Sequence, residues 1–511
     1  MSLNLLARKN VYSMLAETEG EKSGLRRSLG PMSLVALGIG AIIGTGIFVL
    51  VGPAAALKAG PAVVLSFVVA AIASAFAGIC YAEFSAAIPI AGSAYSYGYT
   101  ALGEIVAWII GWALILEYAF GAATVAVGWS GYINSLLHTL GLGLPPSLAA
   151  ARGVDLVYYQ GFWQPASSIK GAAMALIPTM PHTTGAFNLL AFLGILMVTT
   201  ILIIGISESA KVNNAIVVIK VSVLLVFLGI AIIFLNGQGW HVATANWHPF
   251  MPFGWSGVFK GAAFIFFAYI GFDAVSTAAQ EASNPQRDMP VGILGSLIIC
   301  TILYILVGAL LTGIVPWNTL NVPDPVALGV DATGVVWGSV LVKVGAICGL
   351  SSTMLVMLLG QSRIFYTMSN DGLLFKWASR VHPKFKTPYI STLLVGIAVA
   401  IVASIFQVSI LAELTNIGTL TAFAIVCASV WAMRKSEPDL KRPFRTPLVP
   451  IVPIIGILIS LGLIWELGSL TKEVFLVWLL IGLVIYFTYG RKNSTVQHAL
   501  AKATNVRGAV R

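Results

Sequence analysis

Long apolar segments separated by short polar connections dominate this chain of 511 residues. A helix needs about 20 apolar residues to cross a bilayer. Several segments are longer than that, so tilt or extension beyond the membrane is expected. The pattern predicts an all-α, multi-pass membrane protein with twelve transmembrane helices. The predicted segments are 32–54, 61–88, 104–134, 186–207, 212–235, 255–281, 291–315, 337–368, 388–406, 411–433, 449–470 and 473–489.

Composition and charge agree with a membrane protein. Hydrophobic residues make up 58% of the chain and charged residues 9%, which excludes a soluble globular protein of ordinary make-up. No small-residue cleavage site follows the first segment, so no cleavable signal peptide is expected.

With the N-terminus inside, 22 of the 29 Lys and Arg residues lie inside and four outside. This positive-inside bias predicts cytoplasmic termini in a cell (inner or plasma) membrane. The net charge of +10 is therefore explained by the basic residues on the cytoplasmic side of the membrane, and no nucleic acid partner is expected.

Lys220 is the most unusual charge in the pattern. It lies within the apolar run 212–235, about 12 Å from the nearer end at ~1.5 Å per residue. A charge at that depth costs several kcal/mol unless it has a partner or a function, so Lys220 indicates an ion or substrate pathway. Lys260 and Lys343 lie near the starts of their segments, where a lysine can reach the headgroups along its own stem.

Two carboxyl groups also fall within apolar segments. Glu117 is interpreted either as a structural, protonated or hydrogen-bonded carboxyl or as a site residue, and both alternatives stay open. Asp273 lies in Phe266-Phe267-Ala268-Tyr269-Ile270-Gly271-Phe272-Asp273, where we expect it to hydrogen-bond backbone freed by a helix break.

The first segment is rich in glycine, which weakens a helix. Gly38, Gly40, Gly44 and Gly46 fall within nine residues, and each costs roughly 1 kcal/mol relative to alanine. An unwound stretch at Gly44-Thr45-Gly46 would expose amides that attract a carboxylate and carbonyls that attract an ammonium. The sixth segment has a corresponding interruption, and paired interruptions in two halves are the best sequence indicator of a transporter's binding site.

Motifs for other chemistry are missing from the sequence. Cys80, Cys300, Cys348 and Cys427 lie in or near apolar segments and are interpreted as buried packing residues, so neither a disulfide framework nor a metal site is expected. No Walker loop or metalloprotease motif is present. The sequence thus indicates neither an enzyme nor a cofactor.

The chain contains four further motifs: Gly38–Phe48, Pro89–Tyr97, Glu281–Pro290, and Gln361-Ser362-Arg363 with Asp371-Gly372-Leu373-Leu374. They span roughly residues 24–450, and they are specific in combination. Together they resemble the amino acid–polyamine–organocation (APC) superfamily of transporters, specifically bacterial members of the cationic amino acid transporter subfamily. Asn370 and Phe375 depart from the family's usual pattern, in a loop away from the transport site.

The resemblance implies a 5+5 inverted-repeat fold of the leucine-transporter type with helices 1 and 6 broken. Its expected parts are a cytoplasmic N-terminal tail (1–31), a ten-helix transport core (32–433), two accessory helices with a preceding cytoplasmic loop (434–489), and a basic C-terminal tail (490–511). Expected partners are an amino acid, protons and the lipid bilayer. A small single-helix membrane protein or a sterol-like lipid is a further candidate.

The resemblance also implies roles for individual residues. The amides of Thr45 and Gly46 would face the substrate carboxylate, and the carbonyls of Ile42, Phe267, Ala268 and Ile270 would accept its α-ammonium. Lys220 falls where proton-coupled members carry a lysine on the fifth helix. The complete set of candidate substrate-binding residues is Ile42, Ile43, Gly44, Thr45, Gly46, Glu117, Phe267, Ala268, Ile270 and Leu350.

These observations predict a proton-coupled symporter of L-amino acids that works by alternating access. Leu350 occupies the position that faces the substrate side chain in the family, so its apolar side chain favours neutral, apolar substrates. The alternatives are a transporter of arginine or lysine, which Glu117 keeps open, and an uncoupled exchanger, which Lys220 argues against. A channel or receptor lacks support, because no pore-charge ring or signalling domain is present. The long exterior connection 138–185 is expected to pack over the outer mouth.

Overall fold

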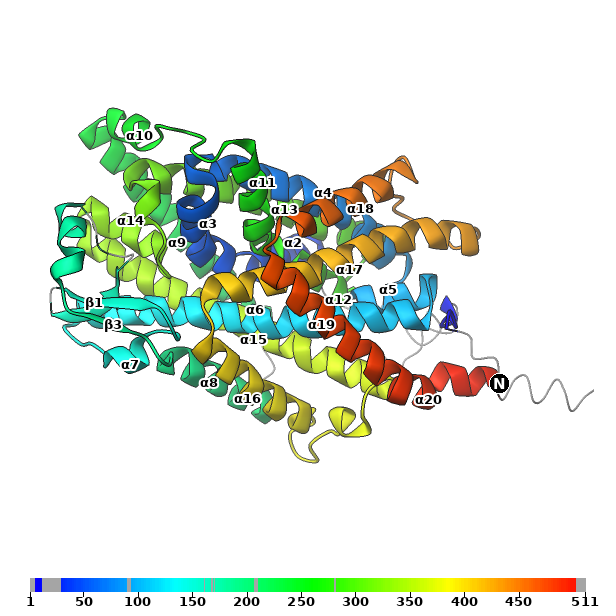
Figure 1. Cartoon of the computed structure of the whole chain (residues 1–511). Helices are drawn as coiled ribbons and strands as arrows, with labels where there is room; N and C mark the ends of the chain where they lie inside the picture. The colour runs from blue at the N-terminus through cyan, green and yellow to red at the C-terminus, as the bar shows by residue number, and fades with distance from the viewer. Residues whose placement is uncertain are drawn as a thin grey trace, which may run out of the picture.

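The computed structural model describes residues 5–11, 29–89, 93–159, 161–166, 169, 171–205, 210–279 and 282–501. Parts of the predicted terminal tails and the motif residues 90–92 and Glu281 lie outside these ranges. Figure 1 shows a long bundle of helices with a small sheet at one end.

Each of the twelve predicted apolar segments contains helix in the part that the structure describes. The first half of the bundle consists of α2 (Pro31–Ile42), the π-helix η2 (Gly46–Leu50), α3 (Val51–Ala54), η3 (Ala55–Ala59), η4 (Gly60–Ala62), α4 (Val63–Ala87), α5 (Ser93–Ala101), α6 (Glu104–Thr139), α7 (Pro146–Ala149), η6 (Gly171–Thr179), α8 (Leu189–Ile204) and α9 (Ala210–Gln238). The second half consists of α10 (His241–Asn246), α11 (Gly254–Ile265), η7 (Phe266–Tyr269), α12 (Phe272–Thr277), α13 (Pro285–Ile314), η8 (Trp317–Thr319), α14 (Pro325–Thr333), α15 (Val336–Asn370), η9 (Lys376–Ser379), α16 (Tyr389–Ile405), α17 (Val408–Ser436), α18 (Ile451–Glu466), α19 (Ser469–Ile485), η10 (Tyr486–Gly490) and α20 (Arg491–Asn493).

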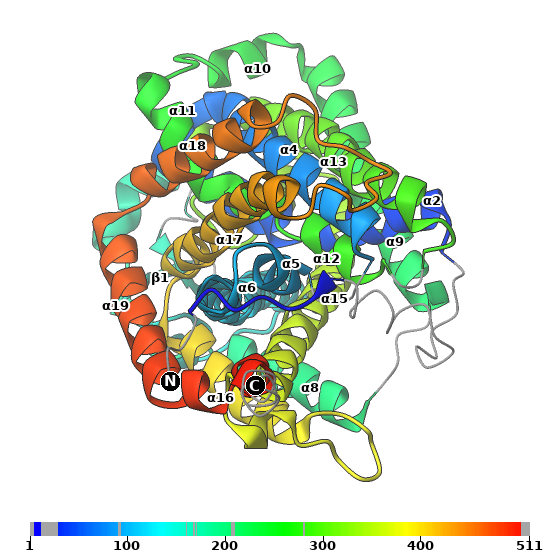
Figure 2. The ribbon, with the colours of Figure 1, turned by 90° about the vertical axis from the view of Figure 1, so that its right-hand side faces the viewer.

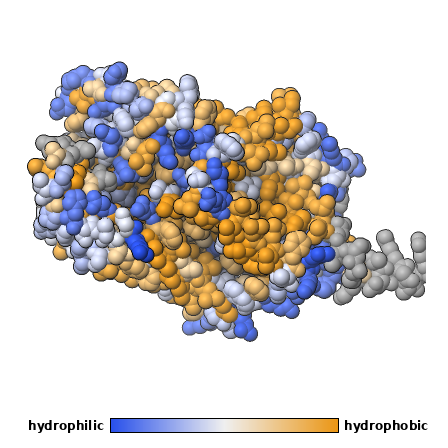
Figure 3. Space-filling view, in the orientation of Figure 1, coloured by the Kyte–Doolittle hydropathy of each residue, from blue (hydrophilic) through white to orange (hydrophobic). Residues whose placement is uncertain are grey.

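The surface of the bundle fits a membrane. Within the described ranges, seven helical stretches are long and apolar enough to cross a bilayer, and three shorter apolar helices (α8, α16 and α18) accompany them. Figure 3 shows hydrophobic residues gathered over the middle of the visible face, around α18 and α19, with hydrophilic residues toward both ends. An apolar band of this kind is what a protein needs when lipid takes the place of water as its solvent.

Two helical segments are interrupted where the glycine and aromatic patterns predict it. α2 ends at Ile42, and a bend at Ile43 and Gly44 separates it from η2. α11 ends at Ile265, passes into the 3-10 turn η7, and resumes as α12 only after Gly271, whose φ is +123°. The interruptions face each other in the centre of the bundle, because α2 packs against α12 and η2 packs against η7.

A three-stranded antiparallel sheet lies at one end of the bundle. Its strand order is β2 (Phe162–Pro165), β1 (Asp155–Tyr159), β3 (His182–Thr184), and Tyr158 pairs with Trp163 in the β1–β2 hairpin. This sheet belongs to the connection between α6 and α8, which the sequence left unassigned. Figure 1 shows β1 and β3 beside α7, at the end of α6 far from α20.

The described parts of both chain termini pack together at the opposite end of the bundle. Figure 2 looks onto this end, where α20 lies near the N-terminal segment. Lys9 forms an ion pair with Asp371 (2.6 Å), whose carboxylate also accepts a hydrogen bond from the Tyr95 hydroxyl (2.7 Å). Glu104, at the start of α6, accepts bonds from Tyr486 (3.0 Å) and Ser494. These contacts tie both termini to the core helices.

Candidate functional site

Lys220 lies at the point where three helices meet. Its side chain is fully buried on α9, and its ammonium Nζ donates to the Gly40 carbonyl oxygen on α2 (2.7 Å) and to the Thr353 hydroxyl on α15 (2.9 Å). Charge-assisted bonds of this length offset part of the cost of burying an ammonium. Because one of the acceptors belongs to the last turns of α2, the lysine holds the broken segment against α9 and α15.

Glycines on the neighbouring helices make room for this arrangement. A Cβ at Gly349 would lie 3.0 Å from the Lys220 Cγ, so the lysine stem passes directly over that glycine. A Cβ at Gly44 would lie 2.8 Å from the Thr353 hydroxyl oxygen. Thr353 therefore contacts both the lysine and the bend in the first segment, although the sequence had indicated only Lys220.

The two interruptions contact each other through glycines. A Cβ at Gly46 would lie 2.1 Å from the Cα of Ala268, and a Cβ at Gly271 would lie 2.7 Å from the carbonyl carbon of Ala41. Real Cβ contacts are not this short, so any larger residue at either position would force the two backbones apart. Each break thus supplies a glycine that lets the other break approach.

Polar side chains from distant helices bind the exposed backbone at these breaks. The Ile42 carbonyl accepts a hydrogen bond from the Tyr304 hydroxyl (2.8 Å), and the Asn416 amide donates to the carbonyls of Ala263 (2.9 Å) and Phe264 (2.8 Å). Asp273 accepts a bond from the Gly271 amide (3.2 Å), the backbone role expected from its sequence position. Sequence reasoning missed Tyr304 and Asn416, because nothing local to either residue indicates which carbonyl it will contact.

All ten candidate substrate-binding residues are buried, so this part of the structure is closed. Nine of them come from the two interruptions and from α15, and the tenth, Glu117, comes from α6. A Cβ at Gly418 would lie 3.5 Å from the Glu117 Cβ, which places Glu117 against α17.

Thr45 and Glu117 stand out among the buried polar groups. Neither the Thr45 hydroxyl oxygen nor either Glu117 carboxyl oxygen has a hydrogen-bond partner among the described residues. Buried polar atoms are normally paired, so unpaired ones need a reason, and a bound polar molecule is one. The break thus presents a hydroxyl that can bind a ligand.

Two expectations are corrected by the structure. Lys343 does not reach the headgroups: it is 3% exposed, and its Nζ contacts the Asp331 carboxylate (3.3 Å) and the Thr139 hydroxyl (3.1 Å). Cys348 is exposed, whereas the other three cysteines are buried. A small, weakly polar thiol can face lipid from α15 at little cost, so an apolar segment alone does not imply burial.

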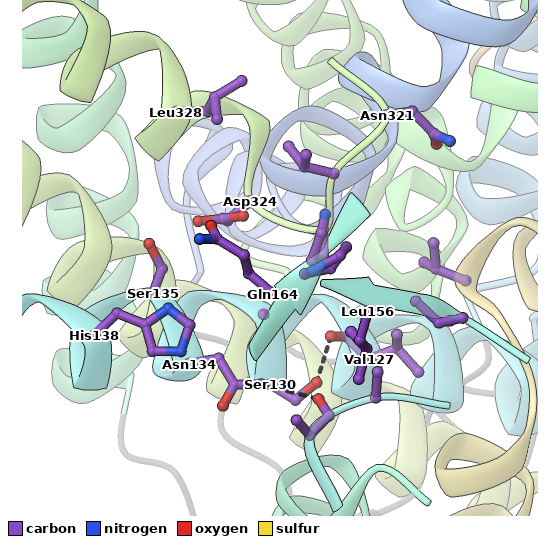
Figure 4. Close-up of a pocket in the computed structure, with 18 of the residues that line it drawn as sticks. Val127, Ser130, Asn134, Ser135, His138, Leu156, Gln164, Asn321, Asp324 and Leu328 are labelled. Carbon is purple, nitrogen blue, oxygen red and sulfur yellow. Dashed lines mark hydrogen bonds between the residues drawn. The ribbon is translucent and has the colours of Figure 1, made fainter. Parts of the chain in front are cut away.

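A cavity of about 790 Å³ lies at the sheet end of the bundle, away from the interruptions. Figure 4 shows polar side chains of α6, including Asn134, Ser135 and His138, together with Gln164 from β2 and Asp324. None of the candidate substrate-binding residues lines it. The α6–α8 connection forms part of its wall.

Comparisons with known proteins place these features in context. A model of the amino acid permease family matches residues 29–492. The chain is 46% identical over 495 residues to the branched-chain amino acid permease BcaP of Bacillus subtilis, covering 97% of this chain and 99% of that protein. It is 43% identical over 492 residues to the methylthioribose transporter of Bacillus subtilis (96% and 99%). It is 36% identical over 437 residues to the vacuolar cationic amino acid transporter 4 of Arabidopsis thaliana (85% and 68%).

Proposed function

The chain belongs to the amino acid permease family of the APC superfamily, and we propose that it is a proton-coupled symporter of neutral, apolar L-amino acids. Family membership makes it a multi-pass membrane transporter and not an enzyme. The observation that carries the proposal is the contact of Lys220 with Gly40 and Thr353, which joins a titratable group to a broken helix.

The proposed architecture has twelve spans and cytoplasmic termini. Ten helices within 32–433 form the inverted-repeat core, and the two helices within 434–489 are accessory. The proposal is supported by the two interruptions, in the first and sixth predicted segments, which is the spacing of two five-helix halves. The positive-inside bias supports the orientation.

The carboxylate and the α-ammonium of the substrate bind at the first interruption. The first amides of a helical segment lack intrahelical partners and carry partial positive charge, so the amides of Thr45 and Gly46 suit a carboxylate. The Thr45 hydroxyl, which is unpaired among the described groups, adds a further donor. Carbonyls of the broken segments accept the α-ammonium, and the Ile42 carbonyl keeps a second lone pair beside its bond from Tyr304.

Lys220 couples transport to protons through its bonds to Gly40 and Thr353. As an ammonium it binds α2 to α9 and α15 by charge-assisted bonds, which are about twice as strong as neutral ones. Loss of the proton weakens these bonds and loosens the first segment, so the two protonation states favour different conformations. A proton bound from one side and released to the other then drives substrate in the same direction.

The candidate side-chain pocket favours an aliphatic substrate. Ile42, Ile43, Phe267, Ile270 and Leu350 are all apolar and at most 3% exposed. Burial of each substrate methylene is worth about 0.8 kcal/mol, whereas an unpaired buried guanidinium costs far more. The similarity to a branched-chain amino acid permease supports this class.

Methylthioribose is a second candidate substrate, because a methylthioribose transporter is almost as similar to this chain. The first interruption argues for an amino acid instead, since its helix start suits a carboxylate, which methylthioribose lacks. Arginine and lysine form the third class to test, through the unpaired carboxyl of Glu117.

Uptake into proteoliposomes tests the proposal. We expect labelled leucine to accumulate under an inward proton gradient in sodium-free buffer, and to accumulate much more than labelled arginine or methylthioribose. Strict sodium dependence, or leucine uptake only against preloaded amino acid, would contradict proton symport. Preferential uptake of methylthioribose or arginine would contradict the substrate class alone.

A further inference from the structure

A chamber lies beside the sheet, at one end of the helix bundle. Its volume of about 790 Å³ is ample for one amino acid, because small-molecule sites usually measure roughly 300–1,000 Å³. It is bounded by the end of α6, the start of α15, the segment before α14, and the β1–β2 hairpin. None of the candidate substrate-binding residues at the helix interruptions lines this chamber.

Lys343 makes the chamber unusual. A lysine that is 3% exposed lines this space, and among the described residues its ammonium lies 3.1 Å from the Thr139 hydroxyl and 3.3 Å from the Asp331 carboxylate. The corresponding bonds of Lys220 measure 2.7 and 2.9 Å. An ammonium has three donors, and the longer bonds are more easily exchanged for a stronger acceptor. A ligand carboxylate would be such an acceptor.

The chamber also offers groups for an ammonium. Asp324, which precedes α14, lines the same space, and Figure 4 shows its carboxylate near the amide of Gln164. Asn134 supplies a further polar group on α6. Groups of both charges in one cavity fit a ligand that itself carries both charges.

We propose that this chamber is a second amino acid site, an antechamber that holds the zwitterion before it reaches the helix interruptions. The ligand carboxylate binds the Lys343 ammonium, and the ligand ammonium binds the Asp324 carboxylate. The inference rests on the proposed function, since it takes the same substrate class. The β1–β2 hairpin forms part of the wall of the antechamber. It contacts α6 through stacking of Phe162 on His138, with ring centroids 4.6 Å apart.

Direct contacts between α6 and η2 separate the antechamber from the first interruption. A Cβ at Gly128 on α6 would lie 2.3 Å from Val49 of η2, and the Tyr132 hydroxyl donates to the Phe48 carbonyl (2.6 Å). In this closed state, these contacts leave no gap between α6 and η2 through which a substrate could pass. The antechamber can therefore be occupied independently of the central site, and movement of η2 away from α6 would join the two.

Binding stoichiometry of the full-length purified protein tests the antechamber. By equilibrium dialysis with labelled leucine, we expect two leucines per wild-type chain and one per Lys343→Gln chain. The matched control is Lys260→Gln, an exposed lysine on α11 that does not line the chamber and should leave two. In proteoliposomes, Lys343→Gln should raise the KM for leucine about tenfold, the effect of losing about 1.4 kcal/mol of binding.

Ser135→Trp provides a second variant that keeps the ion pair of Lys343 intact. Its indole would fill the chamber, so we expect one leucine per chain and the same rise in KM, whereas Ser135→Ala should match the wild type. A wild type that takes up leucine but binds one per chain, with the KM of Ser135→Trp unchanged, would overturn the antechamber alone. A wild type without amino acid uptake would overturn the proposed function as well.

Discussion

The Lys220 ammonium and the Gly40 carbonyl oxygen lie 2.7 Å apart, although 180 residues separate them in the chain. This bond joins a charge in the middle of one apolar helix to the last turns of a broken one. It combines the two features that most distinguish this chain from a simple bundle of membrane helices, so it is the first contact to test.

Replacing Lys220 with alanine should abolish proton-driven leucine uptake. The substitution removes the titratable group, and leaving the Gly40 carbonyl unpaired costs about 1–3 kcal/mol of stability. Leucine binding should persist in part, because the proposed ligands are backbone groups. The measurements are uptake in proteoliposomes and the melting temperature in detergent, with Lys260→Ala as the control. A well-folded Lys220→Ala protein that still concentrates leucine would show that the lysine is structural.

Gly46→Ala should prevent correct folding or abolish uptake. The new Cβ would lie 2.1 Å from the Ala268 Cα, and such overpacking against backbone should cost at least about 3 kcal/mol. Gly229→Ala on α9 is the control, since no atom lies within 4 Å of its new Cβ, and it should be neutral or stabilising by up to about 1 kcal/mol. Expression and thermal stability give the comparison. Equal behaviour of the two variants would refute close packing of the breaks.

Leu350→Ala should reduce the preference for large aliphatic substrates. If this buried side chain contacts the substrate, the KM should rise several-fold for leucine and little for alanine, since each buried methylene contributes about 0.8 kcal/mol. Leu341 lies on the same helix but is 43% exposed, so Leu341→Ala should leave the KM values for leucine and alanine unchanged. Uptake kinetics for leucine and alanine decide the question. An unchanged leucine-to-alanine ratio in Leu350→Ala would remove Leu350 from the pocket.

Glu83→Gln should destabilise the contact of α4 with the end of α17 and with the segment that precedes α18. The buried Glu83 carboxylate accepts two bonds from Arg434 (3.0 and 2.7 Å) and one from the Thr446 amide (2.7 Å). Breaking a buried pair leaves a charge uncompensated, so we expect a loss of about 3 kcal/mol. The exposed Glu473→Gln should change the melting temperature little. Equal melting temperatures for both variants would show that the pair contributes nothing to stability.

The sequence by itself determined the class of the protein and the places where its helices break. Apolar length, charge bias and glycine clusters are local properties, and a bilayer converts them directly into spans and interruptions. Burial of Lys220 followed from its depth in the segment. The bend at Ile43 and Gly44 and the interruption before Gly271 both fall where the residue pattern indicated.

Only the tertiary structure decided which groups meet at those places. Thr353 lies 133 residues from Lys220, and Tyr304 lies 262 residues from the Ile42 carbonyl that it binds. Lys343 looked like a lysine that reaches the headgroups until packing placed Asp331 beside it. Hydropathy records how much a segment prefers lipid to water, but a partner is selected by the packing of distant helices, which no local pattern contains.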